Sequence, residues 1–268
     1  MPYISDGRIM IQDAFKRHYT LPAFNICSAE MIRACIEAAE EEKAPIILQT
    51  YPADSLQIST KHIKNLIKSY AEDATVPIML HMDHGQSLQM DIDCIRNGYS
   101  SVMYDGANQD LSEVIATTKQ LVSITSVASV AVEVAAESFN AGQVEYTKPE
   151  DALKLKEAGA DMIAVSIGTE HGQTGALKLD LLKDIYETLN HPLVIHGGSG
   201  VSAEDYAAAR TFGVVKANIG SALYRALRKV WESSADAKNH REVYERARAA
   251  LKEVAREKIR FMGAEGKA

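Results

Sequence analysis

The sequence predicts an α/β fold, a closed (βα)8 barrel of the TIM type formed by one domain over residues 1–268. Short apolar runs alternate with longer segments of helical period, which is the pattern of repeated βα units. Eight such runs occur in 268 residues, a length at which a single barrel of this kind is common. The runs are almost continuously apolar, which indicates strands buried on both faces. An open, doubly wound sheet is the alternative architecture.

Each strand is expected at one apolar run. The eight runs occupy residues 23–26, 45–50, 76–80, 101–106, 130–134, 162–168, 192–198 and 215–220. Ser28 is the N-cap of the helix that follows the first run, and glycines end the helices expected at 149–157 and 202–211. We expect a helix at 9–18 to cap the bottom of the barrel, and a charged helix at 241–261 to extend the chain beyond the eighth unit.

The composition indicates which binding partners and which cellular compartment to expect. The formal net charge of -7 and the pI of about 5.7 argue against nucleic acid as the main partner. No apolar run approaches the roughly 20 residues of a membrane span, so no membrane association is expected. Cys27, Cys35 and Cys94 form no CxxC pair, which suits reduced thiols. We therefore expect a cytoplasmic protein.

Histidines follow three of the predicted strands. In a parallel barrel the active site lies at the carboxyl ends of the strands. The third strand ends at Asp83 and His84, the sixth is followed by His171, and the seventh ends at His196. A catalytic zinc ion is typically bound by three protein ligands, with a fourth coordination position open to water or substrate. These three histidines are therefore candidate zinc ligands. His81 lies three residues before His84, would face the other way on a regular strand, and is expected to be a supporting residue.

Glycine-rich turns follow the last two strands. The seventh strand leads into the segment 197–200, Gly-Gly-Ser-Gly, and the eighth into 218–221, Asn-Ile-Gly-Ser. Glycines let backbone N–H groups approach an anion, and these two loops are a recurrent phosphate site in barrels. Ser221 also begins the helix expected at 222–231, whose N-terminal dipole would help to hold the anion. The two turns together predict a phosphate ester as ligand.

Five motifs occur together in a familiar order: His-x-Asp-His-Gly, Ser-Val-Met-x-Asp-Gly, Val-Ser-Ile-Gly-Thr-x-His-Gly, Leu-Val-x-His-Gly-Gly-Ser-Gly and the final Asn-Ile. In order and spacing they resemble the zinc-dependent class II ketose-bisphosphate aldolases, in particular the fructose- and tagatose-bisphosphate branch, from about Phe24 to the C-terminus. The resemblance implies reversible cleavage of a ketose 1-phosphate or 1,6-bisphosphate to dihydroxyacetone phosphate and an aldehyde, through a zinc-stabilised enediolate. It also implies a homodimer or homotetramer.

The resemblance assigns roles to individual residues. It implies that His84, His171 and His196 bind one zinc ion per subunit, and that Asp83 moves the proton on the aldehyde-derived oxygen. The residues that it implies for dihydroxyacetone phosphate are Gly172, Gly197, Gly198, Ser199, Asn218, Ile219, Gly220 and Ser221. Backbone groups near Gly172, Gly197 and Ser199 are similar to a site in the family that binds a monovalent cation, Na⁺ or K⁺.

The sequence departs from the family pattern after the fifth strand. Ala135 replaces the second glutamate of a Glu-x-Glu pair, and the loop that follows is several residues short. In the family a glutamate of that loop shuttles the proton of dihydroxyacetone phosphate. We expect Glu145 to be this base, with Glu137 as the alternative.

Further departures concern the aldehyde half of the substrate. Gln49, Thr50 and Tyr51 occupy the exit of the second strand, which in the family faces the aldehyde half. Asn25, at the end of the first strand, and Thr50 are the candidate substrate ligands, and Tyr104 replaces the usual aliphatic residue. Arg260 is the candidate cation for a distant anionic group, in the same subunit or in a neighbouring one. The candidate aldehydes are glyceraldehyde 3-phosphate, a deoxy or thio aldehyde, malonate semialdehyde and sulfolactaldehyde, the last from 6-deoxy-6-sulfofructose 1-phosphate.

Two other functions are compatible with the same residues. A metal-dependent barrel hydrolase would use the three histidines to activate water. Such barrels usually place His-x-His on the first strand, where this chain has Asn25. A non-catalytic sugar-phosphate-binding protein would explain the missing carboxylate at Ala135, but it would have no need of Asp83 as a proton donor.

Overall fold

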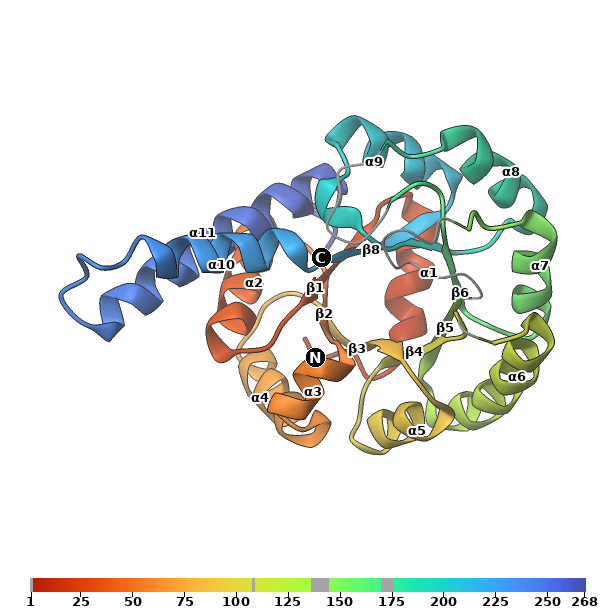
Figure 1. Ribbon diagram of the computed structural model, residues 1–268, viewed down its shortest axis with the longest axis horizontal. Helices are drawn as coiled ribbons and strands as arrows, with labels where there is room; N and C mark the ends of the chain where they lie inside the picture. The colour runs from red at the N-terminus through yellow and green to blue at the C-terminus, as the bar shows by residue number, and fades with distance from the viewer. Residues whose placement is uncertain (1, 108, 136–144, 170–175) are drawn as a thin grey trace.

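The computed structural model describes residues 2–107, 109–135, 145–169 and 176–268, and these ranges form a closed parallel barrel (Figure 1). The strands follow one another around the barrel in chain order. They are β1 (Leu21–Asn25), β2 (Ile46–Thr50), β3 (Ile78–Gly85), β4 (Ser101–Asp105), β5 (Ala131–Ala135), β6 (Met162–Val165), β7 (Leu193–Ile195) and β8 (Val214–Ile219). Because β1 pairs with β8, Leu21 opposite Lys216, the open-sheet alternative is excluded.

Helices surround the barrel and connect its strands (Figure 1). They are α2 (Ala29–Glu42), α3 (Pro52–Gln57), α4 (Thr60–Glu72), α5 (Leu88–Arg96), α6 (Leu111–Ala128), α7 (Pro149–Glu157), α8 (Leu179–Leu189), α9 (Ala203–Ala209) and α10 (Ser221–Glu232), with single 3₁₀ turns η1 (Gly198–Gly200) and η2 (Arg210–Phe212). Ser28, Ser87 and Ser202 begin three of the helices, because each side chain accepts a hydrogen bond from a first-turn backbone N–H. The predicted (βα)8 fold is confirmed.

Helix α1 (Gly7–Arg17) covers the amino-terminal end of the barrel, as expected. The backbone N–H of Gly7 donates to the carbonyl of Ser100, the residue directly before β4. A Cβ atom at Gly7 would lie 2.7 Å from both the Met79 sulfur and that carbonyl oxygen, so only glycine permits this approach. Met10 and Ile11 of α1 are buried in the core beneath the strands. The opposite, carboxyl end of the barrel is therefore the end that is left for a ligand.

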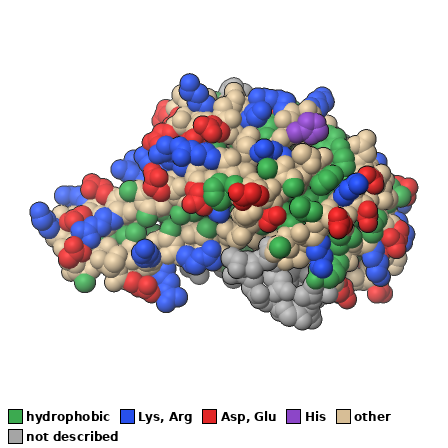
Figure 2. Space-filling view, turned by 90° about the horizontal axis from the view of Figure 1, so that it is seen from above, with side chains coloured by type: hydrophobic (Ala, Val, Ile, Leu, Met, Phe, Trp, Pro, Cys, Tyr) green, Lys and Arg blue, Asp and Glu red, His purple; other side chains and the backbone are tan. Residues whose placement is uncertain are grey.

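The C-terminal helices form an arm. Helix α10 leads away from the barrel, and α11 (His240–Phe261) returns along it and packs against α2 (Figure 1). Figure 2 shows Lys and Arg side chains interspersed with Asp and Glu on the arm, without a continuous basic patch on this face. None of the helices within the described ranges is long and apolar enough to cross a membrane.

Candidate active site

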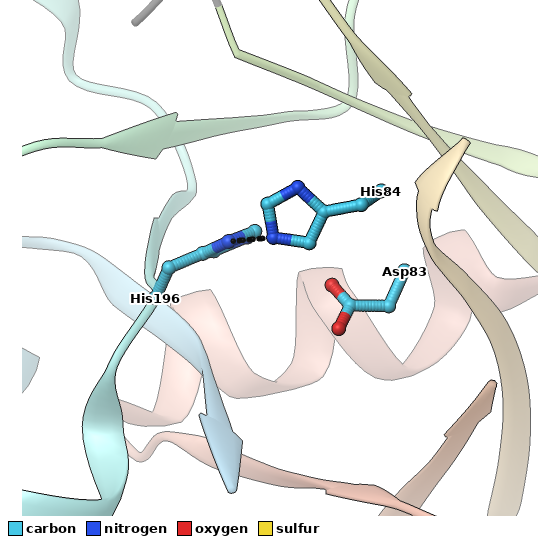
Figure 3. Close-up of side chains that lie close together, drawn as sticks. All are labelled: Asp83, His84 and His196. Atoms are coloured by element: carbon cyan, nitrogen blue, oxygen red, sulfur yellow. Dashed lines mark hydrogen bonds between the residues drawn. The ribbon is translucent and has the colours of Figure 1, made fainter. Parts of the chain in front are cut away.

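Three predicted site residues meet at the carboxyl end of the barrel. Asp83 and His84 come from β3, and His196 directly follows β7 on the other side of the mouth (Figure 3). One potential ligand atom from each lies within 4.8 Å of the other two. All three side chains are buried. The prediction that the ends of these two strands converge on one site is therefore met for these residues.

An unusual backbone conformation brings Asp83 and His84 to the same site. Consecutive side chains on a regular strand point to opposite faces. His84 has a φ of 55°, in the left-handed region, and the pairing of β3 with β4 shifts register between Met82 and Gly85. A non-glycine residue in this region costs of the order of 1–3 kcal/mol, a strain that is typical of functional sites. The turn at His84 directs its ring into the mouth beside the carboxylate of Asp83.

His81 lies deeper in the barrel. Its ring is fully buried, with Nδ1 2.8 Å from Ser101 Oγ and Nε2 3.4 Å from a carboxylate oxygen of Glu133. Burial and the nearby Lys216 hold the pKa of His81 well below its usual value, so the ring is neutral. His81 thus packs below the site, although the regular strand geometry used to predict this does not hold at His84.

The two mouth histidines are oriented by carboxylates. His84 Nδ1 is 2.6 Å from Asp105 Oδ2, and His196 Nε2 is 2.9 Å from Glu133 Oε1. The other nitrogens, His84 Nε2 and His196 Nδ1, lie 2.9 Å apart, within hydrogen-bond distance of each other (Figure 3). A histidine that donates to a carboxylate while its second nitrogen faces a shared point is the usual arrangement around a bound metal. The donor set therefore fits a divalent ion.

The charges of these groups are coupled. Burial lowers the pKa of His84, but the carboxylates of Asp83 and Asp105 outweigh this effect and raise it above its usual value. Burial raises the pKa of Asp105, and the hydrogen bond and charge of His84 more than reverse this shift, leaving its pKa below its usual value. The site is thus negatively charged on the β3 and β4 side, which favours a cation between the rings.

Asp83 is fixed by amide donors. Its Oδ2 accepts from Asn25 Nδ2 at 2.8 Å and from Gln49 Nε2 at 3.2 Å, and its Oδ1 accepts from Asn218 Nδ2 at 2.8 Å. Burial raises the pKa of Asp83, but the charges of His84 and His196 and the bond from Asn25 outweigh burial and lower it. Asp83 is therefore an ionised carboxylate with a fixed orientation, suited to accept a proton from a substrate hydroxyl.

A fully buried ion pair supports the site from below. Lys216 Nζ lies 2.9 Å from Glu133 Oε2 and donates to Asn218 Oδ1 at 2.6 Å. Lys216 thereby orients the amide that binds Asp83, while Glu133 binds His196. The amine is therefore occupied and lies beneath the mouth. Its pairing with Glu133 links β8 to β5, two strands that are not neighbours in the barrel.

Asp83, His84, Asp105, Asn25 and Asn218 line one cavity of about 710 Å³. On one side the cavity is bounded by residues of the predicted phosphate loops, Gly197, Ser199, Asn218, Gly220 and Ser221. Ser199 Oγ accepts from the N–H of Ala222 at the start of α10. A Cβ atom at Gly198 would lie 2.5 Å from the Tyr206 hydroxyl, so this turn requires glycine. Ile219 and Gly198 are buried and are not among the lining residues.

The cavity is also lined by groups that the sequence did not identify as a set. Tyr51, Asp54, Gln86, Gln109 and Tyr224 line it. The ring of Tyr51 lies edge-on to His84 at 5.7 Å, and the Tyr224 hydroxyl hydrogen-bonds with Asp54. Burial raises the pKa of Asp54, and the charge of Asp83 adds to the rise. Of these residues, only Tyr51 was expected at the site from sequence, because it directly follows the second strand.

The structure corrects the expectation for Thr50. Its hydroxyl lies 3.0 Å from the hydroxyl of Tyr99, it is buried, and it does not line the cavity. Side chains alternate along β2, so Gln49 points into the barrel and reaches Asp83, while Thr50 points outward. Asn25, the other candidate on the aldehyde side, does line the cavity.

Arg260 also differs from expectation. Its guanidinium group forms two hydrogen bonds with Glu42, at 2.7 and 3.0 Å, and Arg256 binds the same carboxylate. Glu42 is the last residue of α2, and Arg260 is not among the cavity-lining residues. In its own subunit Arg260 is therefore part of the contact between α11 and α2 and provides no cation to the mouth.

Some predicted residues fall outside the described ranges. These are His171, Gly172 and Glu137. Glu145 is exposed and is not among the described lining residues. Tyr104 is buried and donates to Gln109 Oε1 at 2.6 Å, which positions that wall residue from below.

The fold and the site define a parallel-barrel protein with a candidate metal centre at its mouth. The sequence model of the protein family described as fructose-bisphosphate aldolase class II matches residues 6–267 of this chain. The crystal structure of the YdjI aldolase from Escherichia coli K12 is similar, with a TM-score of 0.89 and 32% identity over 97% of this chain and 98% of that chain. The chain belongs to the class II fructose-bisphosphate aldolase family, and it is an enzyme of the aldolase class.

Curated relatives agree with this assignment. The chain is 32% identical over 287 residues to the sulfofructosephosphate aldolase of Alkalicoccus urumqiensis, covering 100% of this chain and 99% of the relative. It is 34% identical over 236 residues to the fructose-bisphosphate aldolase of Ureaplasma parvum serovar 3, covering 82% of this chain and 80% of the relative. The family is generally zinc-dependent and acts on sugar phosphates.

Proposed function

We propose that this aldolase cleaves a ketose 1-phosphate to dihydroxyacetone phosphate and an aldehyde, and catalyses the reverse condensation. The observation that carries the proposal is the pair of facing nitrogens, His84 Nε2 and His196 Nδ1, 2.9 Å apart beside the amide-held carboxylate of Asp83. His84 and Asp83 line one cavity together with residues of the two phosphate loops. The relatives named for fructose bisphosphate and sulfofructose phosphate support the same class of substrate.

We propose zinc as the metal, bound by His84 and His196 together with His171. When bound, the ion supplies the positive charge that stabilises oxygen anions next to the broken bond. Asp105 and Glu133 hold the two rings in the orientation that this requires. We also propose that a monovalent cation, Na⁺ or K⁺, binds near Gly172, Gly197 and Ser199.

Asp83 performs the first proton transfer. In the cleavage direction its carboxylate takes the proton of the C4 hydroxyl, C4 becomes the aldehyde carbonyl, and the electron pair of the C3–C4 bond stays on the dihydroxyacetone phosphate half. A glutamic acid then gives a proton to C3, which completes the ketone product. We propose Glu145 for this second transfer, with Glu137 as the alternative. In condensation the same steps run backwards.

The phosphate of the donor half is held by backbone and hydroxyl groups. We propose that the N–H groups of 197–200 and 218–221, with the Gly172 segment, bind it, supported by the N-terminus of the twelve-residue helix α10. Gly197 has a φ of 69°, which directs the chain sharply after His196. We propose that these loops serve dihydroxyacetone phosphate and that the rest of the cavity receives the aldehyde.

The remaining proposals concern assembly and compartment. We propose that the chain functions as one domain and forms a homodimer or homotetramer. Support comes from Trp231 and Tyr244 on the α10 and α11 arm, which are 61% and 51% exposed and would be covered in an assembly. Light scattering after gel filtration tests this. A reducing compartment such as the cytoplasm suits the buried free thiols Cys35 and Cys94.

The aldolase reaction is tested by metal content and product release together. Purified enzyme should contain zinc and release dihydroxyacetone phosphate from a ketose 1-phosphate, and chelation should abolish both. His84→Ala should lose metal and activity, whereas Asp83→Ala should keep metal and lose most turnover. His62→Ala, on the exposed face of α4, is the matched control. Full activity of Asp83→Ala would refute the assigned mechanism.

The same assay separates the alternatives. A barrel hydrolase would consume its substrate without releasing dihydroxyacetone phosphate, and a binding protein would bind the ketose phosphate without turnover. Asn25, which replaces the hydrolase His-x-His, binds Asp83 and so belongs to the arrangement that positions a proton acceptor.

A further inference from the structure

His196 lies just beyond the end of a strand. The ladder between β6 and β7 extends to the pair of Val165 and Ile195, and β7 ends at Ile195. Gly197, which follows His196, has a φ of 69°, so the chain turns at once. Ladder hydrogen bonds hold the main chain of a strand residue in place, but His196 is located where this regular pairing has stopped. The position of its main chain therefore depends on contacts from outside β7.

A threonine beyond the end of the neighbouring strand β6 provides such a contact. Thr169 Oγ1 donates to the backbone carbonyl of His196 at 2.7 Å, and both residues are buried. The ring of His196 is held separately, because its Nε2 is 2.9 Å from Glu133 Oε1 and its Nδ1 faces His84 (Figure 3). The main chain and the ring of this candidate metal ligand are thus fixed by different partners.

The exit of β6, residues 166–169, is anchored by the chain that precedes it and by the chain that follows it. The N–H of Ser166 donates to Thr147 Oγ1 at 2.8 Å. The N–H of Lys178 donates to the carbonyl of Ile167, also at 2.8 Å. Thr169 therefore extends from a part of the barrel that is held independently of β7, and its hydroxyl can define where the next strand exit lies.

The bond depends on a hydroxyl group at position 169. A buried carbonyl oxygen that loses its donor is left unfavourably unpaired. Valine has the shape of threonine but offers no donor, and it would place a methyl group against the His196 oxygen. Serine keeps the donor. The substitutions Thr169→Val and Thr169→Ser therefore separate the hydrogen bond from the volume of the side chain.

A second threonine makes the same kind of bond far from the site. Thr20 is fully buried, and its Oγ1 donates to the backbone carbonyl of Val214 at 2.7 Å. Thr20 directly precedes β1 and Val214 begins β8, so this bond lies at the amino-terminal end of the barrel. Thr20→Val thus removes an equivalent buried bond between two strands without touching the mouth.

We propose that Thr169 is a positioning residue for the catalytic metal, which holds the main chain of His196 so that its ring meets His84. In the sequence Thr169 lies two residues before His171, the third proposed ligand, so the same bond fixes the start of that segment relative to His196. Thr169 is not among the described lining residues of the cavity and acts through His196. The inference rests on the proposed zinc-dependent function and extends it to a residue that holds a ligand in place.

Zinc affinity tests the inference without relying on turnover. In competition with a fluorescent chelator, Thr169→Val should bind zinc about 10- to 100-fold more weakly than the parent enzyme, the usual effect of losing an outer partner of a metal ligand. Thr169→Ala removes the same donor without placing a methyl group against the carbonyl, and it should weaken zinc binding to a similar degree. Thr169→Ser should retain the parental affinity.

The matched variant separates positioning from general stability. Thr20→Val should lose about as much stability as Thr169→Val in urea unfolding of the metal-free protein, but it should keep the parental zinc affinity. Replacement of zinc by Co²⁺ gives a spectroscopic readout, because the visible absorption of Co²⁺ depends on the geometry of its ligands. This absorption should change in Thr169→Val and remain that of the parent in Thr20→Val.

The possible results distinguish this inference from the proposed function. Parental zinc affinity in both Thr169→Val and Thr169→Ala would overturn the role of Thr169. An equal loss of affinity in Thr20→Val would also overturn it, since the effect would then follow from stability alone. A parent enzyme that binds no zinc would overturn the proposed zinc site and this inference with it. Zinc binding by the parent without release of dihydroxyacetone phosphate from a ketose 1-phosphate would refute the aldolase reaction and leave the role of Thr169 in place.

Discussion

His84 Nε2 and His196 Nδ1 face each other across 2.9 Å at the barrel mouth, and the remaining nitrogen of each ring is bound to a carboxylate. The two carboxylates differ in setting. Asp105 ends β4 at the rim, whereas Glu133 lies fully buried inside the barrel, next to Lys216. The orientation of the metal-facing nitrogens therefore depends on residues that do not face the metal position themselves.

Loss of these carboxylates should weaken metal binding. Glu133→Gln and Asp105→Asn should each lower zinc affinity about 10- to 100-fold, because outer carboxylates fix the ring orientation and raise ligand basicity. Competition against a chromogenic chelator measures the affinity directly, without relying on turnover. Asp110→Asn, an exposed acid just before α6, is the control. Unchanged zinc affinity in both variants would contradict the orienting role of these carboxylates.

The buried lysine should be costly to remove. Lys216→Met leaves the carboxylate of Glu133 without its cation in a fully buried position, and breaking a buried pair in this way costs about 3–5 kcal/mol. Lys183→Met breaks an exposed pair with Glu187 on α8 and should cost less than about 1 kcal/mol. Urea unfolding curves of the two variants give the comparison. Equal losses of stability would show that Lys216 is not an essential partner of Glu133.

The sequence was sufficient for the barrel and for the residues at its rim. Apolar runs and glycine stops define the βα units, and a parallel barrel necessarily brings the strand ends, including Asp83, His84 and His196, to one face. The sequence did not show which of two adjacent strand residues points into the barrel. Thr50 and Gln49 are adjacent, and only the register of β2 decides which of them enters the barrel.

Long-range partners were not accessible from sequence at all. Arg260 and Glu42 are 218 positions apart, and no local pattern connects them. The hydrogen-bonded pair of Asp54 and Tyr224 is similarly dispersed, because Asp54 comes from α3 and Tyr224 from α10. The left-handed turn at His84 also lacks a glycine or asparagine that would announce it.

Asp91 should make stability fall as pH rises. It is fully buried on α5 against Gly85, and within the described part of the chain neither carboxylate oxygen has a hydrogen-bond partner. Burial holds the pKa of Asp91 well above its usual value. In the unfolded chain that pKa is about 3.9. Between these values the unfolded chain releases a proton that the folded chain keeps, so the free energy of unfolding falls by up to about 1.4 kcal/mol per pH unit.

The variant Asp91→Ala removes this proton linkage. Its stability relative to the parent enzyme should therefore increase between pH 4.5 and pH 7.5, and urea unfolding at the two pH values measures the change. Asp93→Asn, on the exposed side of the same helix, should show the same difference from the parent at both pH values. A difference for Asp91→Ala that does not depend on pH would mean that the buried carboxyl is ionised or paired in the folded protein.

The second proton transfer should depend on one glutamate of the segment after β5. If Glu145 is the shuttle, Glu145→Gln should slow solvent exchange of the C3 proton of dihydroxyacetone phosphate by about 10²- to 10⁴-fold, the usual contribution of a general base. Zinc affinity should not change, because Glu145 is exposed and is not a candidate ligand. Glu150→Gln, in the exposed first turn of α7, is the matched control. Normal exchange in Glu145→Gln, with loss of exchange in Glu137→Gln, would transfer the role to Glu137.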